Sequence, residues 1–180
     1  RYILWNKAME HISGMRREAL LGKSPFEEFP FLEEVGEGEA FRNAIKGKPT
    51  VREAMPYNVP QTGRHGFFQS AHFPLFDANG NIVGGMAIVR DVTAQMQNER
   101  RVKAQHAVTQ ILVESSTIKE ASLKIIEVVC ECLAWDVGEL WLADKQKGVL
   151  CLAESWHSPT IELPGFEAIT RKTTFAPGIG

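Results

Sequence analysis

Carboxylates and thiols are the groups in this sequence whose types and spacing could support chemistry. Four glutamates lie close together, and a pair of carboxylates can act as general acid and base; they are Glu33, Glu34, Glu37 and Glu39. An acidic run beside two glycines is more typical of a solvated loop, which is the structure we expect here. The sequence contains no nucleophile elbow and no phosphate-binding glycine loop. It therefore predicts no catalytic residue.

The cysteines do not form a metal or disulfide motif. The chain has three of them, Cys130, Cys132 and Cys151, an odd count that does not suit a secreted disulfide scaffold. Positions i and i+2 of a helix point to different faces, so Cys130 and Cys132 do not have zinc-ligand spacing. We expect no metal site, and reduced thiols in a cytoplasmic protein.

Composition limits the classes of protein to which the chain can belong. The 180 residues are 44% hydrophobic and 23% charged, which is typical of a globular protein. A net charge of −2 argues against a nucleic-acid partner. The longest run of apolar residues and glycine, 82–89, is much shorter than the ~20 residues of a membrane helix. We expect no signal peptide at Arg1, and because the sequence stops in an apparent loop we expect both ends to be cut from a longer protein.

The first half reads as an α+β domain with one antiparallel sheet. Turn formers and apolar spacing predict short helices at 7–12, 15–21 and 38–46. Strands are expected at 51–59, 65–76 and 81–92, the last two joined by a tight turn at 77–80 that contains Asn-Gly.

The second half begins with a long helix. Residues 94–114 contain no glycine or proline and carry a thin apolar stripe, so this helix is expected to need a partner. Thr117 and Glu120 match a capping box for a second helix that runs to about Leu133. Strands at 137–143 and 149–156 then open a second α+β domain.

Four segments of the first half resemble the PAS family. They are YILWNKAME at 2–10, MRREALLGK at 15–23, FPLFDANGNIVGG at 73–85 and RDVT at 90–93. The resemblance implies a sensor domain over 1–93, lacking its first strand before Tyr2, whose sheet curls around short helices and a small interior pocket. It also implies a signalling linker helix over 94–115.

Residues 116–180 are similar to the opening part of a GAF domain. The matching segments are LWLAD at 140–144 and FAPGIG at 175–180. PAS followed by GAF implies the cytoplasmic input region of a sensor histidine kinase in a two-component phosphorelay, with the output domain further along the chain. An enzyme whose catalytic part lies beyond Gly180 is compatible with this interpretation.

The resemblance places a ligand pocket inside the first domain. On this basis Phe68, Ser70 and His72 share the inner face of one strand. The alternative is that the same side chains simply close-pack as the core. The expected lining consists of Met9, Ile12, Phe41, Ile45, Met55, Tyr57, Phe68, His72, Ala87 and Val89.

The resemblance does not specify which cofactor such a pocket would hold. Flavin that forms a cysteinyl adduct is excluded, because all three cysteines lie outside 1–93. Heme-binding members usually take their axial histidine from the helix at 38–46, which has none here. This argues against heme. A lone strand histidine is more often a hydrogen-bonded wall residue than a ligand, and these are the two roles open to His72.

Asp91 and Thr93 are the expected signal-relay residues, because they join the last strand to the long helix. The alternative is a plain helix cap. The thin stripe of the long helix suggests a parallel homodimer. A ligand-free PAS module for dimerisation or protein docking is therefore the main alternative to a ligand sensor.

Overall fold

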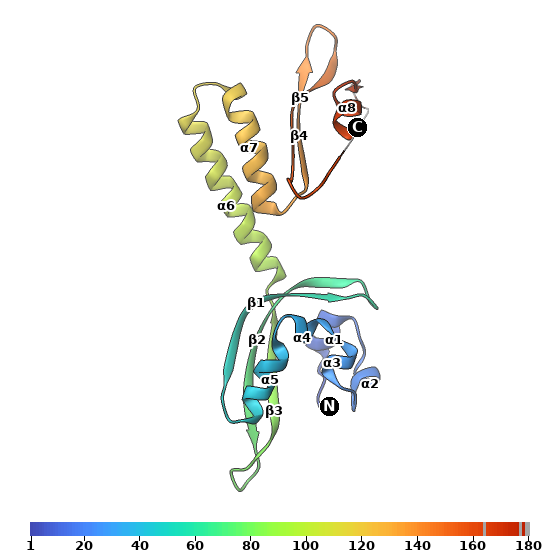
Figure 1. Cartoon of the computed structure of the whole chain (residues 1–180), viewed down its shortest axis with the longest axis vertical. Coiled ribbons are helices and arrows are strands. Elements are labelled where there is room, and N and C mark those ends of the chain that lie inside the picture. Colours follow the sequence, from blue (N-terminus) through green and yellow to red (C-terminus); the bar gives the residue numbers. More distant parts are fainter. Residues whose placement is uncertain (164, 177, 179–180) are drawn as a thin grey trace. The chain divides into compact units, whose positions relative to one another are not determined.

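The computed structural model describes residues 1–163, 165–176 and 178. The chain consists of two compact units, Arg1–Met96 and Gln97–Gly180 (Figure 1). Each unit combines helices with a three-stranded antiparallel sheet, which confirms the α+β class predicted from the sequence. No helix in the described residues has the length and apolar character needed to cross a bilayer.

The first unit starts with five short helices, which lie on one side of its sheet (Figure 1). The side-chain oxygen of Asn6 accepts a hydrogen bond from the amide of Met9 at 3.0 Å and so caps the first helix. Gly14 ends that helix in the left-handed conformation, at φ 72°. The helices are α1 (Lys7–Ser13), α2 (Arg17–Leu20), α3 (Pro25–Glu28), α4 (Phe31–Glu34) and α5 (Glu37–Ile45).

The sheet of this unit has the order β1-β2-β3. Its strands agree with the predicted ranges to within a residue or two; they are β1 (Thr50–Val59), β2 (Arg64–Phe76) and β3 (Ile82–Asp91). The predicted tight turn joins β2 to β3. There Asp77 Oδ1 accepts from the amides of Asn79 and Asn81 at 2.9 and 2.8 Å, and Gly80 supplies the positive φ of 82°.

An aromatic core holds the helices against the sheet. Trp5 stacks on Phe29 with ring centroids 5.8 Å apart, and its indole N–H donates to the carbonyl of Met15 at 3.2 Å. This hydrogen bond satisfies the one polar atom of a side chain that is otherwise buried. The core consists of Trp5, Leu20, Phe29, Tyr57, Val59 and Phe68.

The second unit contains most of the long helix. Thr117 caps the helix that follows, its hydroxyl accepting from the amide of Glu120 at 3.2 Å, as predicted. The Glu120 carboxylate reaches back to the amide of Ser116 rather than to that of Thr117. The elements are α6 (Thr93–Glu114), α7 (Ile118–Leu133), β4 (Val137–Asp144), β5 (Val149–His157), α8 (Phe166–Thr170) and β6 (Thr174–Phe175), with sheet order β4-β5-β6. The loop predicted at 175–180 lies partly outside the described residues.

Candidate functional site

A cluster of buried polar side chains lies between α5 and the sheet of the first unit. Glu37 is 2% exposed, Ser70 1% and His72 not at all. Glu37 begins α5, whereas Ser70 and His72 are alternate residues of β2. The expectation of a solvated acidic loop is therefore wrong for Glu37, because the start of α5 carries its side chain inward onto β2. Its neighbours Glu33, Glu34 and Glu39 are exposed.

Glu37 is the centre of this cluster. Its Oε2 lies 2.7 Å from His72 Nε2, and its Oε1 accepts from the Ser70 hydroxyl at 2.9 Å. The guanidinium Nε of Arg52, on β1, lies 3.5 Å from the same Oε1. Three groups thus converge on one buried carboxylate, which is the arrangement that makes burial of a negative charge tolerable.

Backbone conformation brings Glu37 and Arg52 together. Gly36 precedes α5 in the left-handed conformation, at φ 82°, and a Cβ there would lie 3.1 Å from the Arg52 guanidinium. Arg52 also donates to the carbonyl of Val35 at 2.5 Å. Any larger residue at position 36 would therefore have a strained backbone and a tight contact with the end of the Arg52 side chain.

His72 has an unusual environment within the cluster. Its ring meets the ring of Phe41 edge to face, with centroids 4.5 Å apart, and it pairs with Thr50 and Ala87 on the neighbouring strands. Its Nε2 lies near both Glu37 and Ser70. Its Nδ1 is buried and has no hydrogen-bond partner among the residues that the structure describes.

The ten residues expected to line a pocket occupy three kinds of position. Phe41, His72 and Ala87 lie in or next to the polar cluster. Ile45 is 54% exposed and does not join the interior. The remaining six pack in or against the aromatic core, as in the alternative of a close-packed interior; they are Met9, Ile12, Met55, Tyr57, Phe68 and Val89.

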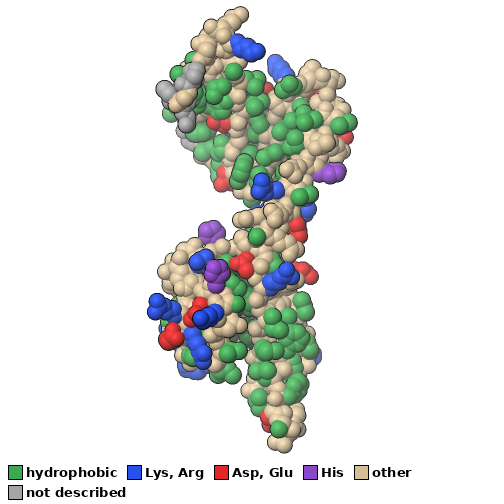
Figure 2. Space-filling model, turned by 180° about the vertical axis from the view of Figure 1, so that it is seen from behind, with side chains coloured by type: hydrophobic (Ala, Val, Ile, Leu, Met, Phe, Trp, Pro, Cys, Tyr) green, Lys and Arg blue, Asp and Glu red, His purple; other side chains and the backbone are tan. Residues whose placement is uncertain are grey.

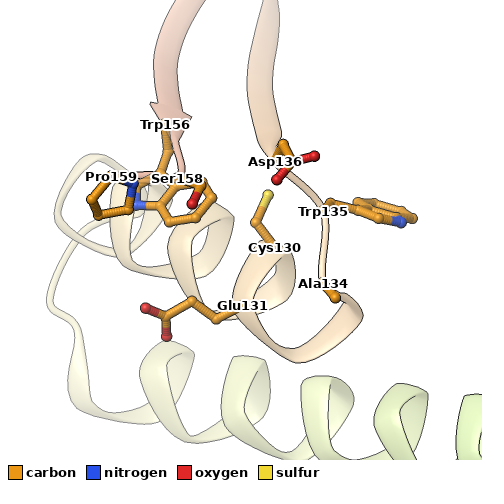
Figure 3. A pocket seen from close by; sticks show the side chains of 8 residues that line it. All are labelled: Cys130, Glu131, Ala134, Trp135, Asp136, Trp156, Ser158 and Pro159. Carbon is orange, nitrogen blue, oxygen red and sulfur yellow. The ribbon is translucent and has the colours of Figure 1, made fainter. Parts of the chain in front are cut away.

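A cavity of about 290 Å³ is open in the second unit, where α7 ends beside β5 (Figure 3). The Cys130 thiol points into it, and burial raises the pKa of that thiol, so it is not an activated nucleophile. No group of His, Cys, Asp or Glu side chains in the described part of the chain has the arrangement of a metal site. The cavity is lined by Cys130, Glu131, Ala134, Trp135, Asp136, Trp156, Ser158 and Pro159.

The two expected relay residues link β1, β2 and α6. Asp91 Oδ1 accepts from the amide of Thr93 at 2.8 Å, and the Tyr57 hydroxyl donates to Asp91 Oδ2 at 3.3 Å. The Thr93 hydroxyl accepts from the amide of Phe67 at 2.9 Å and lies 3.3 Å from the carbonyl of the same residue. Both residues thus make more contacts than a plain helix cap requires.

Electrostatics at this junction follow from these contacts. Burial tends to raise the pKa of Asp91, but hydrogen bonds from Thr93 and Tyr57 outweigh it, and the pKa lies below the ordinary 3.8. The pKa of Tyr57 is raised, first by burial and then by the negative charge of Asp91. The junction therefore favours an ionised Asp91 beside a neutral Tyr57.

Asp91→Asn is expected to cost about 1 kcal/mol of the free energy of unfolding at neutral pH, because a charged cap acceptor is lost. Because the folded-state pKa of Asp91 is lowered, its contribution is present above the ordinary 3.8 and is lost as pH falls through the folded-state value. Urea titrations of both proteins should therefore converge in acid. A gap that stays constant down to the lowest pH would contradict this assignment.

Comparison with known proteins agrees with this architecture. The family model described as the PAS fold matches residues 1–97. No curated protein matches this chain. The match covers the five short helices, the first sheet and the start of α6.

Solved structures give matches at low identity. The PAS domain of a protein from Colwellia psychrerythraea is 23% identical over 50% of this chain and 75% of its own, with a TM-score of 0.42. The VqmA dimer of Vibrio cholerae, in the absence of its target DNA, is 20% identical over 72% of this chain and 66% of its own, also at 0.42. The dark structure of the Aureochrome1 LOV photoreceptor is 18% identical over 56% of this chain and 75% of its own, at 0.38. The family match covers more than half of the 180 residues, and the chain therefore belongs to the PAS-fold family.

Proposed function

We propose that this chain is the sensory input region of a multidomain signal-transduction protein. Residues 1–93 would detect the signal, and the helix over 94–115 would carry it onward. The observation that carries this proposal is the junction at Asp91 and Thr93, where side chains of β1, of the end of β3 and of the start of α6 are hydrogen-bonded to one another or to the backbone of β2. A displacement of β1 or β2 would change the contacts that hold the first turn of α6.

The finer assignments belong to this proposal. The signal would be a small molecule in the first unit or a change relayed through a helical dimer. Residues 116–180 would be the first part of a GAF-like domain, and the parent protein a cytoplasmic sensor histidine kinase with its output domain further along the chain. The motifs at 140–144 and 175–180 and the free state of all three cysteines support this context.

Transmission from the interior to α6 can be tested with Ser70→Ala in the full chain. The substitution removes the Ser70 hydroxyl from Glu37, and we expect amide hydrogen exchange over 92–96 to accelerate about tenfold. Ser13→Ala is the matched control, because Ser13 is also a buried serine of this unit but lies outside the cluster. Accelerated exchange confined to α5 and β2, or equal in both variants, would contradict transmission.

The outer face of the first sheet favours a second role, as a dimerisation surface for another copy of this chain. Val51 is 66% exposed, Met86 39% and Ile88 55%. The strand register places Val51 and Ile88 on either side of Ala71. Hydrophobic side chains gather in one region over this unit (Figure 2). Water-exposed apolar area of this kind usually marks a contact surface.

Charge placement favours a second copy as the partner. Glu53 and Arg90 are both exposed, on β1 and β3 at the two edges of the sheet. Two sheets that face each other about an axis parallel to their strands place β1 of one copy over β3 of the other. Glu53 would then lie near Arg90 of the second copy, and both α6 helices would leave the sheets at the same end.

Sedimentation of charge variants tests this dimer. Glu53→Arg is expected to weaken self-association about tenfold, because it opposes two positive side chains. The double variant Glu53→Arg/Arg90→Glu should restore the affinity. Ile88→Glu should weaken association further, and Val102→Glu, at an exposed position of α6, is the control for added charge. A wild-type chain that remains monomeric, or no rescue in the double variant, would contradict this geometry.

A further inference from the structure

The starting point is an unsatisfied hydrogen-bonding atom in the centre of the first unit. His72 is fully buried, and its Nδ1 has no partner within the described residues. Almost all buried polar atoms in proteins are paired with other protein atoms or with ordered water. An unpaired ring nitrogen in a buried histidine whose other ring nitrogen is hydrogen-bonded therefore indicates a missing partner.

The contacts of His72 define what that partner must be. Its Nε2 lies 2.7 Å from the Glu37 carboxylate. An ionised carboxylate accepts hydrogen bonds and cannot donate them, so the proton of this hydrogen bond is on Nε2. A neutral imidazole then presents a lone pair at Nδ1. A doubly protonated ring would leave a buried N–H without an acceptor. The atom that is missing opposite Nδ1 is therefore a hydrogen-bond donor.

The surroundings exclude charged partners. An anion would meet the lone pair of Nδ1 and the negative charge of Glu37 nearby. A cation would have to leave water for a position beside Phe41 and Ala87, and the charge of Glu37 is already matched by Arg52. A neutral hydroxyl or N–H on a small apolar body avoids both costs.

We propose that His72 Nδ1 is the recognition atom of a site for a small, neutral molecule that donates one hydrogen bond. This inference rests on the proposed sensory function and names the class of ligand. Phe41, on α5, would contact the apolar body of the ligand, and Glu37 would hold the tautomer of His72. A bound ligand would therefore contact both α5 and β2, next to the cluster that Ser70→Ala perturbs.

Phenol and its methyl ether, anisole, are suitable probes, because they share a ring and differ in the donor. Their binding can be followed through the side-chain ¹⁵N resonances of His72 in the full chain, assigned by their absence in His72→Gln. We expect the resonances to show the Nε2–H tautomer. We also expect phenol to move the Nδ1 resonance and to bind at least about tenfold more tightly than anisole, because the site is built to accept a donor.

Two substitutions separate the two ring nitrogens. His72→Gln places an amide near the position of Nε2, so it can keep the contact with Glu37 and should lose the preference for phenol. His72→Asn places an amide near Nδ1 and should keep part of that preference at a lower melting temperature. If His72→Asn does not fold, the comparison of His72→Gln with the wild type is sufficient.

Several results would overturn the proposal. These are an Nδ1–H tautomer, equal affinities for phenol and anisole, or no binding of phenol. The last result, together with a water resonance close to Nδ1, would assign the missing donor to a buried water alone. None of these results would affect hydrogen exchange in Ser70→Ala, so failure of the ligand site and failure of transmission to α6 remain distinguishable.

Discussion

Glu37→Ala is expected to lower the free energy of unfolding of the first unit by about 3–5 kcal/mol, because it removes the charged acceptor of several hydrogen bonds in the interior of that unit. The carboxylate is 2% exposed, and its oxygens contact His72 Nε2, the Ser70 hydroxyl and the Arg52 guanidinium. Alanine leaves these groups without their acceptor. His72, which is fully buried, has no access to water as a replacement.

The loss can be measured by urea denaturation followed through the indole N–H of Trp5, which reports on the first unit. Glu39→Ala is the matched control, an exposed glutamate of the same helix that should change stability by less than about 0.5 kcal/mol. The double substitution Glu37→Leu/His72→Phe should recover part of the loss, because it removes the imidazole N–H together with its acceptor and puts apolar side chains in their place. A cost below about 1 kcal/mol for Glu37→Ala would show that the contacts of Glu37 contribute little to the stability of the first unit.

Most elements of the fold could be predicted because their signals are local. Asn6, Gly14, Thr117 and the turn after Asp77 each act through hydrogen bonds or backbone angles within a few residues. Such signals are complete in the sequence itself. The strand boundaries follow from the same turns, and the observed ranges therefore lie close to the predicted ones.

The buried cluster could not be predicted, because its partners are far apart in sequence. Glu37 and His72 are separated by 35 positions, and the local composition around Glu37 is that of an exposed loop. One signal was present. Phe68, Ser70 and His72 are every second residue of one strand, so all three lie on its buried face. The polar side chains of Ser70 and His72 therefore require a polar partner there. The sequence does not specify which glutamate or arginine supplies it.

A relay role for Asp91 and Thr93 was predicted from a motif and stays a prediction, and the two residues differ in their contacts. Asp91 connects the start of α6 to Tyr57 of β1, whereas Thr93 connects it to the backbone of Phe67 on β2. The contact of Thr93 with Phe67 depends on Gly66, a position that no motif in the sequence marks. Gly66 lies opposite Tyr57, and a Cβ on it would meet Thr93 Oγ1 and lie 3.0 Å from the Tyr57 ring.

Gly66→Ala is therefore expected to destabilise the first unit by about 2–3 kcal/mol, because the added methyl group must displace the Thr93 hydroxyl from Phe67. Gly84→Ala is the matched control. It also places a methyl group on a strand glycine of this sheet, but the nearest atom to its Cβ lies at 4.0 Å. Equal costs for the two variants in urea titrations would contradict a steric role for Gly66.

A double-mutant cycle separates this clash from general damage to β2. In a Thr93→Ala background the hydroxyl is already absent, so Gly66→Ala should cost about 1–2 kcal/mol less than it does in the wild type. Hydrogen exchange over 92–96 should follow the same pattern, with Gly66→Ala and Thr93→Ala each loosening the first turn of α6 and the double variant adding little. Non-additivity in both measurements would identify the Thr93 hydroxyl as the physical link between sheet and helix. Simple additivity would instead show that the added methyl group does not act through the Thr93 hydroxyl, and would leave the contact of Asp91 with Tyr57 as the connection between sheet and helix.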